Sequence, residues 1–449
     1  MTEIITDEDR YPTLTERGRA MLKFLREHPA APIFRNQSGN RLTASEVAAQ
    51  RVFEQEILAS QVGWAQHSKP EWLDDFVKQT CQHVPYFNFY SPQTTRFEDL
   101  PTISRADLAK DIAQFVPDNL PLERMMNFRT SGTSGHPLLI PSHPVVAARY
   151  LAFHKRALRR FGIELQYGSG QVGVVLLGFQ RKCFTYVSVN PTMEESGLAK
   201  INLHVDDWQL PEDRAVYLNA LAPEVYAGDP LSFAELLTLP LSAKPRALIS
   251  VAMQLSTGLR AQLQDKFACP VLDVYSMNEA GPIAVYDPQV TGYALLQARM
   301  YVEVLDKTGK PVGAGEQGEI TLTGGFNDYL PLLRYRTGDY ARLVHHDTQI
   351  ILRDLCGRHP LRYRLASGEW INNIDITHAL AALAIPQYAV HQDAHGEIVL
   401  KLAATHRQHA EHASNILAAL FGVRTIRVET LHAEDKVVQY TSDLKGART

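Results

Sequence analysis

An alternation of short apolar runs with a helical window, in the middle of the chain, limits the possible fold more than any other feature. Runs rich in β-branched residues recur there at 172–177, 187–189, 225–227, 247–251 and 271–275. Between the last two lies a window, 257–267, whose apolar residues have helical spacing. Because strand, helix and strand follow one another, this region is predicted to be an α/β domain built on a sheet.

The residues before this alternation have a helical pattern. Thr43 or Ser45 can cap a first helix, whose apolar positions recur mostly at helical spacing. A second helical stretch covers 72–83 and ends before Pro85, and Ser104 precedes a third helix start. We therefore expect residues 1–70 to form a helical lead-in to the α/β domain.

Beyond residue 300 the pattern changes to hairpins and then to a smaller unit. Strand candidates at 301–305 and 318–323 flank a turn-rich link, and those at 340–344 and 348–352 flank a short polar link. Further strand candidates (362–365, 397–403, 424–428) and helix candidates (373–383, 408–421) follow. The prediction is a domain of residues 1–355 and a small α+β domain of residues 356–449.

Composition narrows the class of protein. Of the 449 residues, 45% are hydrophobic and 21% are charged, and the net charge of −4 does not favour a nucleic-acid partner. Four cysteines (Cys81, Cys183, Cys269, Cys356) lie far apart without a CxxC pair, which is typical of reducing cytosol. The acidic start differs from a signal peptide, and the apolar run 172–179 is too short to span a bilayer. A cytoplasmic enzyme without a membrane partner is expected.

The most informative stretch is the sequence TSGTSG at 130–135. Six consecutive small or hydroxylated residues cannot pack a core, whereas glycines and bare N–H groups can surround an anion. A P-loop would need a Gly-Lys-Ser/Thr ending, which is absent here. Taken alone, the stretch fits an ordinary surface loop equally well.

Two further stretches carry an aromatic residue or carboxylates at strand ends. In DVYSMNEAGP, an apolar strand leads to Tyr275 and then to Glu279, which could stack on a base and hold Mg²⁺. In LRYRTGDY, Asp339 follows the turn residue Gly338 and precedes a strand, where a carboxylate can accept from two ribose hydroxyls. Alone, the first also fits a solvated loop carboxylate and the second a simple Asx turn.

Together these stretches are more specific. TSGTSG, YSMNEAG, RYRTGD and the CGR of 356–358 occur in the order found in the AMP-forming adenylating enzymes, which the chain resembles. This superfamily contains acyl-CoA synthetases, luciferases and the adenylation domains of peptide synthetases. The match is closer to its phenylacetate–CoA ligase branch, through HVPYF (83–87), EDLPTISRADL (98–108) and PEVYAGDP (223–230). The resemblance covers roughly residues 70–449 and implies a large sheet-and-helix domain with a small, mobile C-terminal domain.

The resemblance also implies a role for each matching residue. The phosphate loop that would surround the β- and γ-phosphates of ATP consists of Thr130, Ser131, Gly132, Thr133, Ser134 and Gly135. Tyr275 is expected to stack on adenine, and the other side of the base would be lined by Ser250, Val251 and Ala252. Asn278 would reach the α-phosphate, and Glu279 would hold Mg²⁺.

Three more residues complete the expected site. Asp339 would bind both ribose hydroxyls, and Arg358 would lie near the ribose or the phosphate. Such enzymes place a mobile catalytic lysine near the C-terminus, where its long stem can bring a point charge to the reacting groups. Lys436 in EDKVV fits this role best, Lys445 in DLKG is the alternative, and a chain without a catalytic lysine is the third possibility. The expected catalytic groups are therefore Lys436, Glu279 and Arg358.

The sequence departs from the family pattern at three places. Leu138 and Leu139 stand where members often carry a lysine after the phosphate loop. The usual GRxxD hinge reads GRHPL, without its acidic residue, so domain rotation is expected to pivot elsewhere. The glycine-rich acyl-pocket segment of the branch is not evident between 168 and 203. We therefore expect an acid other than phenylacetate.

These features predict a two-domain ligase. A carboxylic acid, aryl or otherwise, would react with ATP and Mg²⁺ to give acyl-AMP, and the thiol of CoA would then take the acyl group. Two alternatives stay open: transfer to a carrier-protein thiol or an amine, and a non-catalytic nucleotide-binding scaffold with the same fold. A homodimer is also open.

Overall fold

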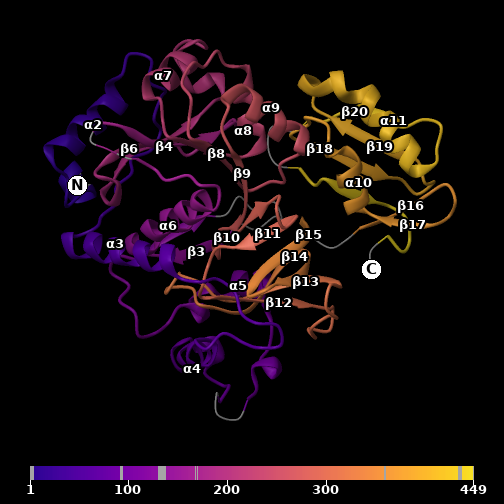
Figure 1. The fold of residues 1–449 in the computed structure, drawn as a ribbon, viewed down its shortest axis with the longest axis horizontal. Helices are drawn as coiled ribbons and strands as arrows, with labels where there is room; N and C mark the ends of the chain where they lie inside the picture. The colour runs from indigo at the N-terminus through magenta and orange to yellow at the C-terminus, as the bar shows by residue number, and fades with distance from the viewer. Residues whose placement is uncertain are drawn as a thin grey trace. The chain divides into compact units, whose positions relative to one another are not determined.

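The computed structural model describes residues 5–91, 95–129, 138–166, 168, 170–357, 361–432 and 437–447. The chain groups into two compact units, whose elements are drawn in Figure 1. Unit 1 consists of Met1–Thr43, Phe161–Asp273 and Pro360–Thr449, and unit 2 of Ala44–Arg160 and Val274–His359. The expected division between residues 355 and 356 stays a prediction.

The sheet of unit 1 is mostly parallel. Its strand order is β9 (Val271–Met277), β8 (Ala247–Ser250), β7 (Val225–Gly228), β4 (Val172–Gly178), β6 (Ser196–Asn202) and β5 (Tyr186–Asn190). Only β5 is antiparallel to its neighbour. Its other elements include α2 (Glu16–Glu27), α7 (Asp213–Leu221), α8 (Pro230–Thr238) and α9 (Thr257–Phe267). Parallel strands that are covered on both faces have nearly continuous apolar sequences, and the apolar residues of these strands are mostly buried. The prediction of an α/β domain is confirmed.

The beginning of the chain belongs to this unit. Leu22 and Leu25 on α2 are buried in the same core as Val187 and Val189 on β5. After α2, the backbone N–H of Ile33 donates to the carbonyl oxygen of Asp207 at 2.7 Å. Residues 1–43 are therefore part of the packed unit and not merely a lead-in to it.

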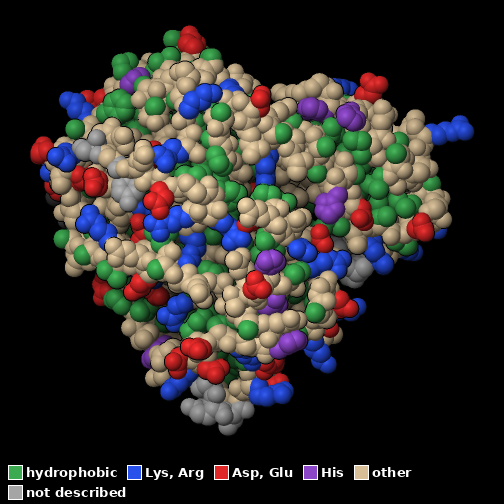
Figure 2. All heavy atoms as spheres, viewed as in Figure 1, with side chains coloured by type: hydrophobic (Ala, Val, Ile, Leu, Met, Phe, Trp, Pro, Cys, Tyr) green, Lys and Arg blue, Asp and Glu red, His purple; other side chains and the backbone are tan. Residues whose placement is uncertain are grey.

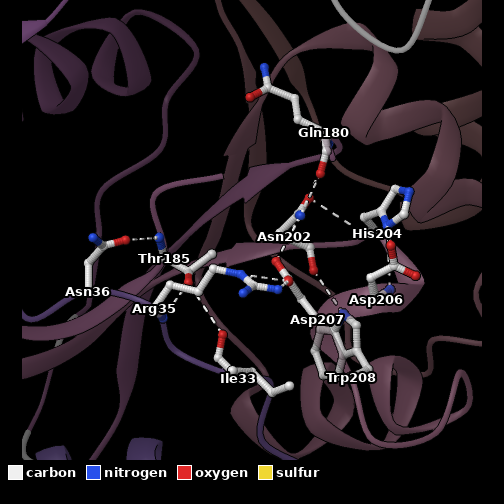
Figure 3. Close-up of polar contacts among 10 residues, drawn as sticks. All are labelled: Ile33, Arg35, Asn36, Gln180, Thr185, Asn202, His204, Asp206, Asp207 and Trp208. Atoms are coloured by element: carbon white, nitrogen blue, oxygen red, sulfur yellow. Dashed lines mark hydrogen bonds and ion pairs between the residues drawn. The ribbon is translucent and has the colours of Figure 1, made fainter. Parts of the chain in front are cut away.

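Figure 3 shows the polar cluster that holds this segment. The Asp207 side chain is buried, accepts hydrogen bonds from the guanidinium of Arg35, and accepts one from Nδ2 of Asn202 at 2.8 Å. Nearby, the N–H of Arg35 donates to the hydroxyl of Thr185, and Asn36 exchanges two bonds with the backbone of Thr185. A buried carboxylate is tolerated when it is paired and hydrogen-bonded, as it is here.

The last part of unit 1 is a small α+β layer. Its four-stranded sheet has the order β20 (Arg427–Thr430), β19 (Ile398–Leu402), β18 (Tyr388–Gln392), β21 (Tyr440–Ser442). A second, two-stranded sheet pairs β16 (Arg362–Arg364) with β17 (Trp370–Asn372). The helices α10 (Asn373–Leu380) and α11 (Ala410–Phe421) share its buried apolar core. The predicted mixture of strands and helices in this region is confirmed.

The sheet of unit 2 is antiparallel along its main path. After the end of β9 the order is β10 (Gly281–Asp287), β11 (Gly292–Leu295), β15 (Gln349–Gly357), β14 (Leu332–His346), β13 (Gln317–Gly324) and β12 (Met300–Leu305). The short β1 (Ile103–Ser104) pairs in parallel with β14. The hairpins β12–β13 and β14–β15 confirm the two predicted from the sequence.

Helices and one small hairpin complete unit 2. The helices are α3 (Ala44–Ala59), α4 (Leu73–His83), α5 (Arg105–Lys110) and α6 (Pro144–Arg160). The hairpin pairs β2 (Met126–Arg129) with β3 (Leu139–Ser142). The expected helix starts near residues 43, 72 and 104 are confirmed, and a capping box at Ser104 closes the start of α5.

One expectation about β14 is wrong. Asp339 was expected between a glycine turn and a following strand, but β14 runs without a break from Leu332 to His346. The strand absorbs two left-handed residues, Arg334 at φ 50° and Gly338 at φ 79°, and its pairing with β13 shifts register twice. Such bulges bend a strand, so Asp339 lies within a bent strand.

The surface of the molecule carries charges of both signs. Figure 2 shows Lys and Arg side chains interspersed with Asp and Glu on the face that it displays. Among the helices of the described part of the chain, none is both long and apolar enough to cross a lipid bilayer.

A buried ion pair anchors β14. The Arg334 guanidinium donates two hydrogen bonds to the carboxylate of Glu303 on β12, at 3.1 and 3.2 Å. Its Nη1 donates to the carbonyl oxygens of Glu98 and Leu100, at 2.6 and 2.7 Å. Burial raises the pKa of Glu303, and the nearby guanidinium opposes that rise. Arg334 therefore ties β12 and the segment before β1 to β14.

We predict that Arg334→Met lowers the free energy of unfolding by about 3–5 kcal/mol, because it leaves the Glu303 carboxylate buried without its cation. Urea denaturation would measure the change. Since protonation removes the buried charge, the loss should be smaller at about pH 5 than at about pH 8.

The control is Arg342→Met, whose partner Asp354 lies on the surface and whose own side chain is 44% exposed. We expect it to leave stability unchanged within error. The double variant Arg334→Met/Glu303→Met should recover most of the loss. Equal destabilisation by the double and single variants would contradict this account.

Candidate functional site

Four of the expected nucleotide-binding residues lie in unit 2 at two places in its sheet. Tyr275 is on β9, Asn278 and Glu279 follow β9 directly, and Asp339 is on β14. Three strands, β10, β11 and β15, separate β9 from β14 in the sheet order. Side chains of β9 and β14 nevertheless touch, so the sheet must curve strongly enough to bring these strands face to face.

The first contact joins Tyr275 to Asp339. The phenol hydroxyl of Tyr275 donates a hydrogen bond of 2.8 Å to Oδ2 of Asp339. Burial and the neighbouring carboxylate hold the pKa of Tyr275 well above its usual value, so the phenol stays a neutral donor. An aromatic face beside a fixed carboxylate could receive a base and a ribose next to each other.

The second contact surrounds Glu279, whose side chain is 4% exposed. Its Oε1 accepts from Nη1 of Arg105 at 2.7 Å and from the hydroxyl of Tyr335 at 3.3 Å. Burial and the carboxylate raise the pKa of Tyr335 well above its usual value, so this hydroxyl is also a neutral donor. The carboxylate thus has one cationic and one neutral partner.

Glu279 can supply one carboxylate ligand to Mg²⁺, whose other ligands would be water and the phosphate oxygens of a nucleotide. No group of three His, Cys, Asp or Glu side chains suited to a metal occurs in the described part of the chain. Mg²⁺ is commonly held by one or two carboxylates together with substrate phosphates, and Glu279 can supply one such carboxylate. Glu279 would hold the ion here, with phosphate oxygens as further ligands.

Arg105 was missed by the sequence analysis. It lies in the stretch EDLPTISRADL, which carried part of the resemblance, but no role was assigned to it. The capping signal of Ser104 fixes Arg105 as the first residue of α5. What the sequence does not show is the pairing of β1 with β14, which places Arg105 beside Glu279.

The expected adenine-lining residues lie in unit 1, at the carboxyl end of β8. Ser250 is fully buried, and its hydroxyl has no hydrogen-bond partner among the described residues. Ala252 has φ 68°, a left-handed conformation that is unfavourable for a residue with a Cβ. Ligands of α/β sheets bind at the carboxyl ends of parallel strands, which is where Ser250, Val251 and Ala252 lie.

The remaining expected residues are outside the described part of the chain. These are Thr130, Ser131, Gly132, Thr133, Ser134, Gly135, Arg358 and Lys436. The strands on either side of the phosphate loop, β2 and β3, pair with Arg129 opposite Leu139. The alternative lysine, Lys445, is described and is exposed.

Comparison with known proteins shows which proteins this fold is similar to. Residues 173–327 match the family model described as AMP-binding enzyme. A crystal structure of 2-hydroxyisobutyryl-CoA ligase, in the postadenylation state with R3-HIB-AMP, covers 87% of this chain and 89% of its own, with a TM-score of 0.62 and 16% identity. The chain has the fold of the AMP-forming adenylating enzymes. The same ligase in an open conformation, with 2-HIB-AMP and CoA, matches with a TM-score of 0.54 over 86% of this chain and 91% of its own, at 16% identity.

Curated relatives match over a shorter stretch. The phenylacetate-coenzyme A ligase of Escherichia coli (strain K12) is 31% identical over 91 residues, which is 19% of this chain and 21% of the relative. The enzyme of the same name from Pseudomonas putida is 31% identical over 90 residues, 19% of this chain and 20% of the relative. The matched part thus spans about a fifth of the relatives' length.

We predict that Asp339→Ala weakens ATP binding by about 1.5–3 kcal/mol, on the order of 10- to 100-fold in Kd, because charged hydrogen bonds to the ribose would be lost. Tyr275→Phe removes the bond that holds the carboxylate and keeps the aromatic ring, so its effect should be about 0.5–1.5 kcal/mol. Isothermal titration calorimetry would measure both.

The control is Asp118→Ala, which removes an exposed carboxylate of the same unit. It should bind ATP as the unchanged protein does. Unchanged affinity in Asp339→Ala would exclude Asp339 from the nucleotide site.

Proposed function

We propose that this protein activates a carboxylic acid with ATP and transfers the acyl group to the thiol of CoA. The observation that carries the proposal is the pair of contacts Tyr275–Asp339 and Glu279–Arg105 in one unit. They bring an aromatic ring, a carboxylate for a ribose, a carboxylate for a metal and a cation together. The adenylating fold and the CoA ligases among the relatives support the same reaction.

The chemistry proceeds in two steps. A carboxylate oxygen attacks the α-phosphorus of ATP, the bond to the bridging oxygen breaks, and pyrophosphate leaves. The CoA sulfur then attacks the acyl carbon and AMP leaves with the bonding electrons. Hydroxide is a poor leaving group and AMP a good one, so the first step makes the second feasible.

Each residue of the candidate site has its own role in the first step. Asp339 and Tyr275 hold and orient the nucleoside, and Asn278 reaches the α-phosphate. Glu279 would hold Mg²⁺, which would supply positive charge at the phosphates when bound. Lys436 adds a preorganised cation where negative charge develops, which is the kind of stabilisation that most lowers such barriers. Thr130, Ser131, Gly132, Thr133, Ser134 and Gly135 surround the outer phosphates, and Arg358 contacts the ribose or phosphate.

The acid is an aryl or other organic acid and not phenylacetate itself. This choice rests on the segment VVLLGFQRKCFTYVSVNP, at 174–191, which replaces the glycine-rich acyl-pocket pattern of the phenylacetate branch. We place the reaction in the cytoplasm, which the widely spaced cysteines favour.

The deciding experiment is ATP–pyrophosphate exchange with a panel of aryl and aliphatic acids. At least one acid should promote exchange in the complete, Mg²⁺-supplemented protein. Acyl-AMP formed with that acid is then offered CoA, a phosphopantetheinylated carrier protein or a simple amine. If an acid promotes exchange but only the carrier protein or the amine accepts the acyl group, that acceptor replaces CoA in the proposal. ATP binding without exchange for any acid would leave a nucleotide-binding scaffold.

We predict that Lys436→Ala lowers acid-dependent exchange by on the order of 10²–10³, because the adenylation step loses a cation that faces the developing charge. ATP binding should barely change. Acyl transfer from synthetic acyl-AMP to CoA should also survive, since that step does not need the lysine. The paired assay separates the two half-reactions.

Lys445→Ala is the matched control and should keep full exchange activity. If Lys436→Ala keeps full activity and Lys445→Ala loses it, the catalytic lysine is Lys445. Equal loss in both half-reactions for Lys436→Ala would point to misfolding of the C-terminal part.

A further inference from the structure

The backbone fixes the place of Arg105 beside Glu279. In the pairing of β1 with β14, Ile103 lies opposite Tyr335 and Ser104 opposite Arg336. Arg105 is the next residue of the chain and begins α5, two residues beyond the partner of Tyr335. Both side chains then reach the same carboxylate oxygen of Glu279, at 2.7 Å from Arg105 and 3.3 Å from Tyr335.

The two partners of this ion pair are buried to different degrees. The side chain of Glu279 is 4% exposed, whereas that of Arg105 is 34% exposed. A buried carboxylate needs a partner, and a guanidinium supplies one before any metal arrives. A half-exposed arginine can leave such a contact far more easily than the carboxylate, which is fixed at the end of β9.

A metal ion at Glu279 would compete with this arginine. Mg²⁺ binds oxygen at about 2.0–2.1 Å, and a guanidinium held against the same oxygen would repel it. An arginine displaced from a carboxylate binds phosphate oxygens well, because its planar donors match either anion. Tyr335 is neutral, so its hydroxyl can stay on Glu279 in both situations.

We propose that Arg105 is an exchangeable counter-ion of Glu279, replaced by the metal and transferred to the nucleotide phosphates when Mg·ATP binds. The proposal rests on the proposed function, since it takes the nucleotide to bind at Glu279. Arg105 thereby has two roles: it pairs with the buried carboxylate in the empty site, and it binds phosphate in the loaded site.

This exchange predicts that Arg105→Met changes the affinity for the metal and the affinity for the nucleotide in opposite directions. Removing the competitor should tighten metal binding to the nucleotide-free protein, about threefold or more. Removing the phosphate cation should weaken the Mg²⁺ complex of α,β-methylene-ATP by about 10-fold or more, the usual scale for a charged hydrogen bond. Electron paramagnetic resonance with Mn²⁺ as the probe measures the first change, and calorimetry measures the second.

Two variants serve as controls. Arg96→Met removes an exposed arginine of the same unit, paired only locally with Asp99, and should alter neither titration. Arg105→Lys keeps the charge but loses the planar fork, so Mn²⁺ binding should stay as in the unchanged protein and nucleotide binding should weaken by several-fold. If Arg105→Met does not fold, Arg105→Lys serves as the test, because it should weaken nucleotide binding without changing Mn²⁺ binding.

The outcomes separate this proposal from the proposed function. If Arg105→Met weakened the binding of both Mn²⁺ and the nucleotide, or of neither, the exchange proposal would be overturned and the ion pair would be purely structural. If the unchanged protein bound no nucleotide, the proposed function would fail and the transfer to phosphate with it, whereas the Mn²⁺ titration would still report competition at Glu279. If Arg105→Met changed the two affinities in opposite directions but no acid promoted ATP–pyrophosphate exchange, the counter-ion proposal would stand and the ligase function would be rejected.

Discussion

The buried pair of Arg334 and Glu303 is the interaction on which the candidate site depends. A buried guanidinium needs an acceptor for each of its donors. Arg334 donates to the Glu303 carboxylate on β12 and to the carbonyl oxygens of Glu98, Leu100 and Gly309. This places β1 along β14, and β1 in turn delivers Arg105 to Glu279. The ion pair that stabilises β14 therefore also fixes the geometry of the polar contacts at Glu279.

Much of the fold could be predicted from the sequence, because its elements have strong local signals. The window 257–267 matches α9 from end to end, and the apolar runs of the middle of the chain correspond to the strands of unit 1. Local signals also placed the start of α5 at Ser104. They did not reveal that β14 bends through two left-handed residues, because Arg334 has no reason in its own sequence neighbourhood to adopt φ 50°.

The sequence allows single residues of the candidate site to be proposed, but it does not show how they are arranged. Tyr275, Glu279 and Asp339 stood out by their places near strand ends, and the resemblance assigned them roles but no contacts. The bond of Tyr275 to Asp339 joins residues 64 positions apart, across a sheet whose curvature depends on bulges and register shifts. Arg105 escaped notice because its function follows from the pairing of β1 with β14, a contact between segments more than 200 residues apart.

The Asp207 cluster has a consequence for how this chain can be divided. Sequence resemblance begins near residue 70, yet Ile33, Arg35 and Asn36 are bonded to the loops around Thr185 and Asp207. β5 is the last strand of its sheet, and the buried residues of α2 share a core with it. A fragment trimmed to the recognisable family region would uncover apolar surface beside an edge strand, the combination that promotes aggregation. The natural cutting point for expression therefore lies before α2, well outside the region that similarity alone would select.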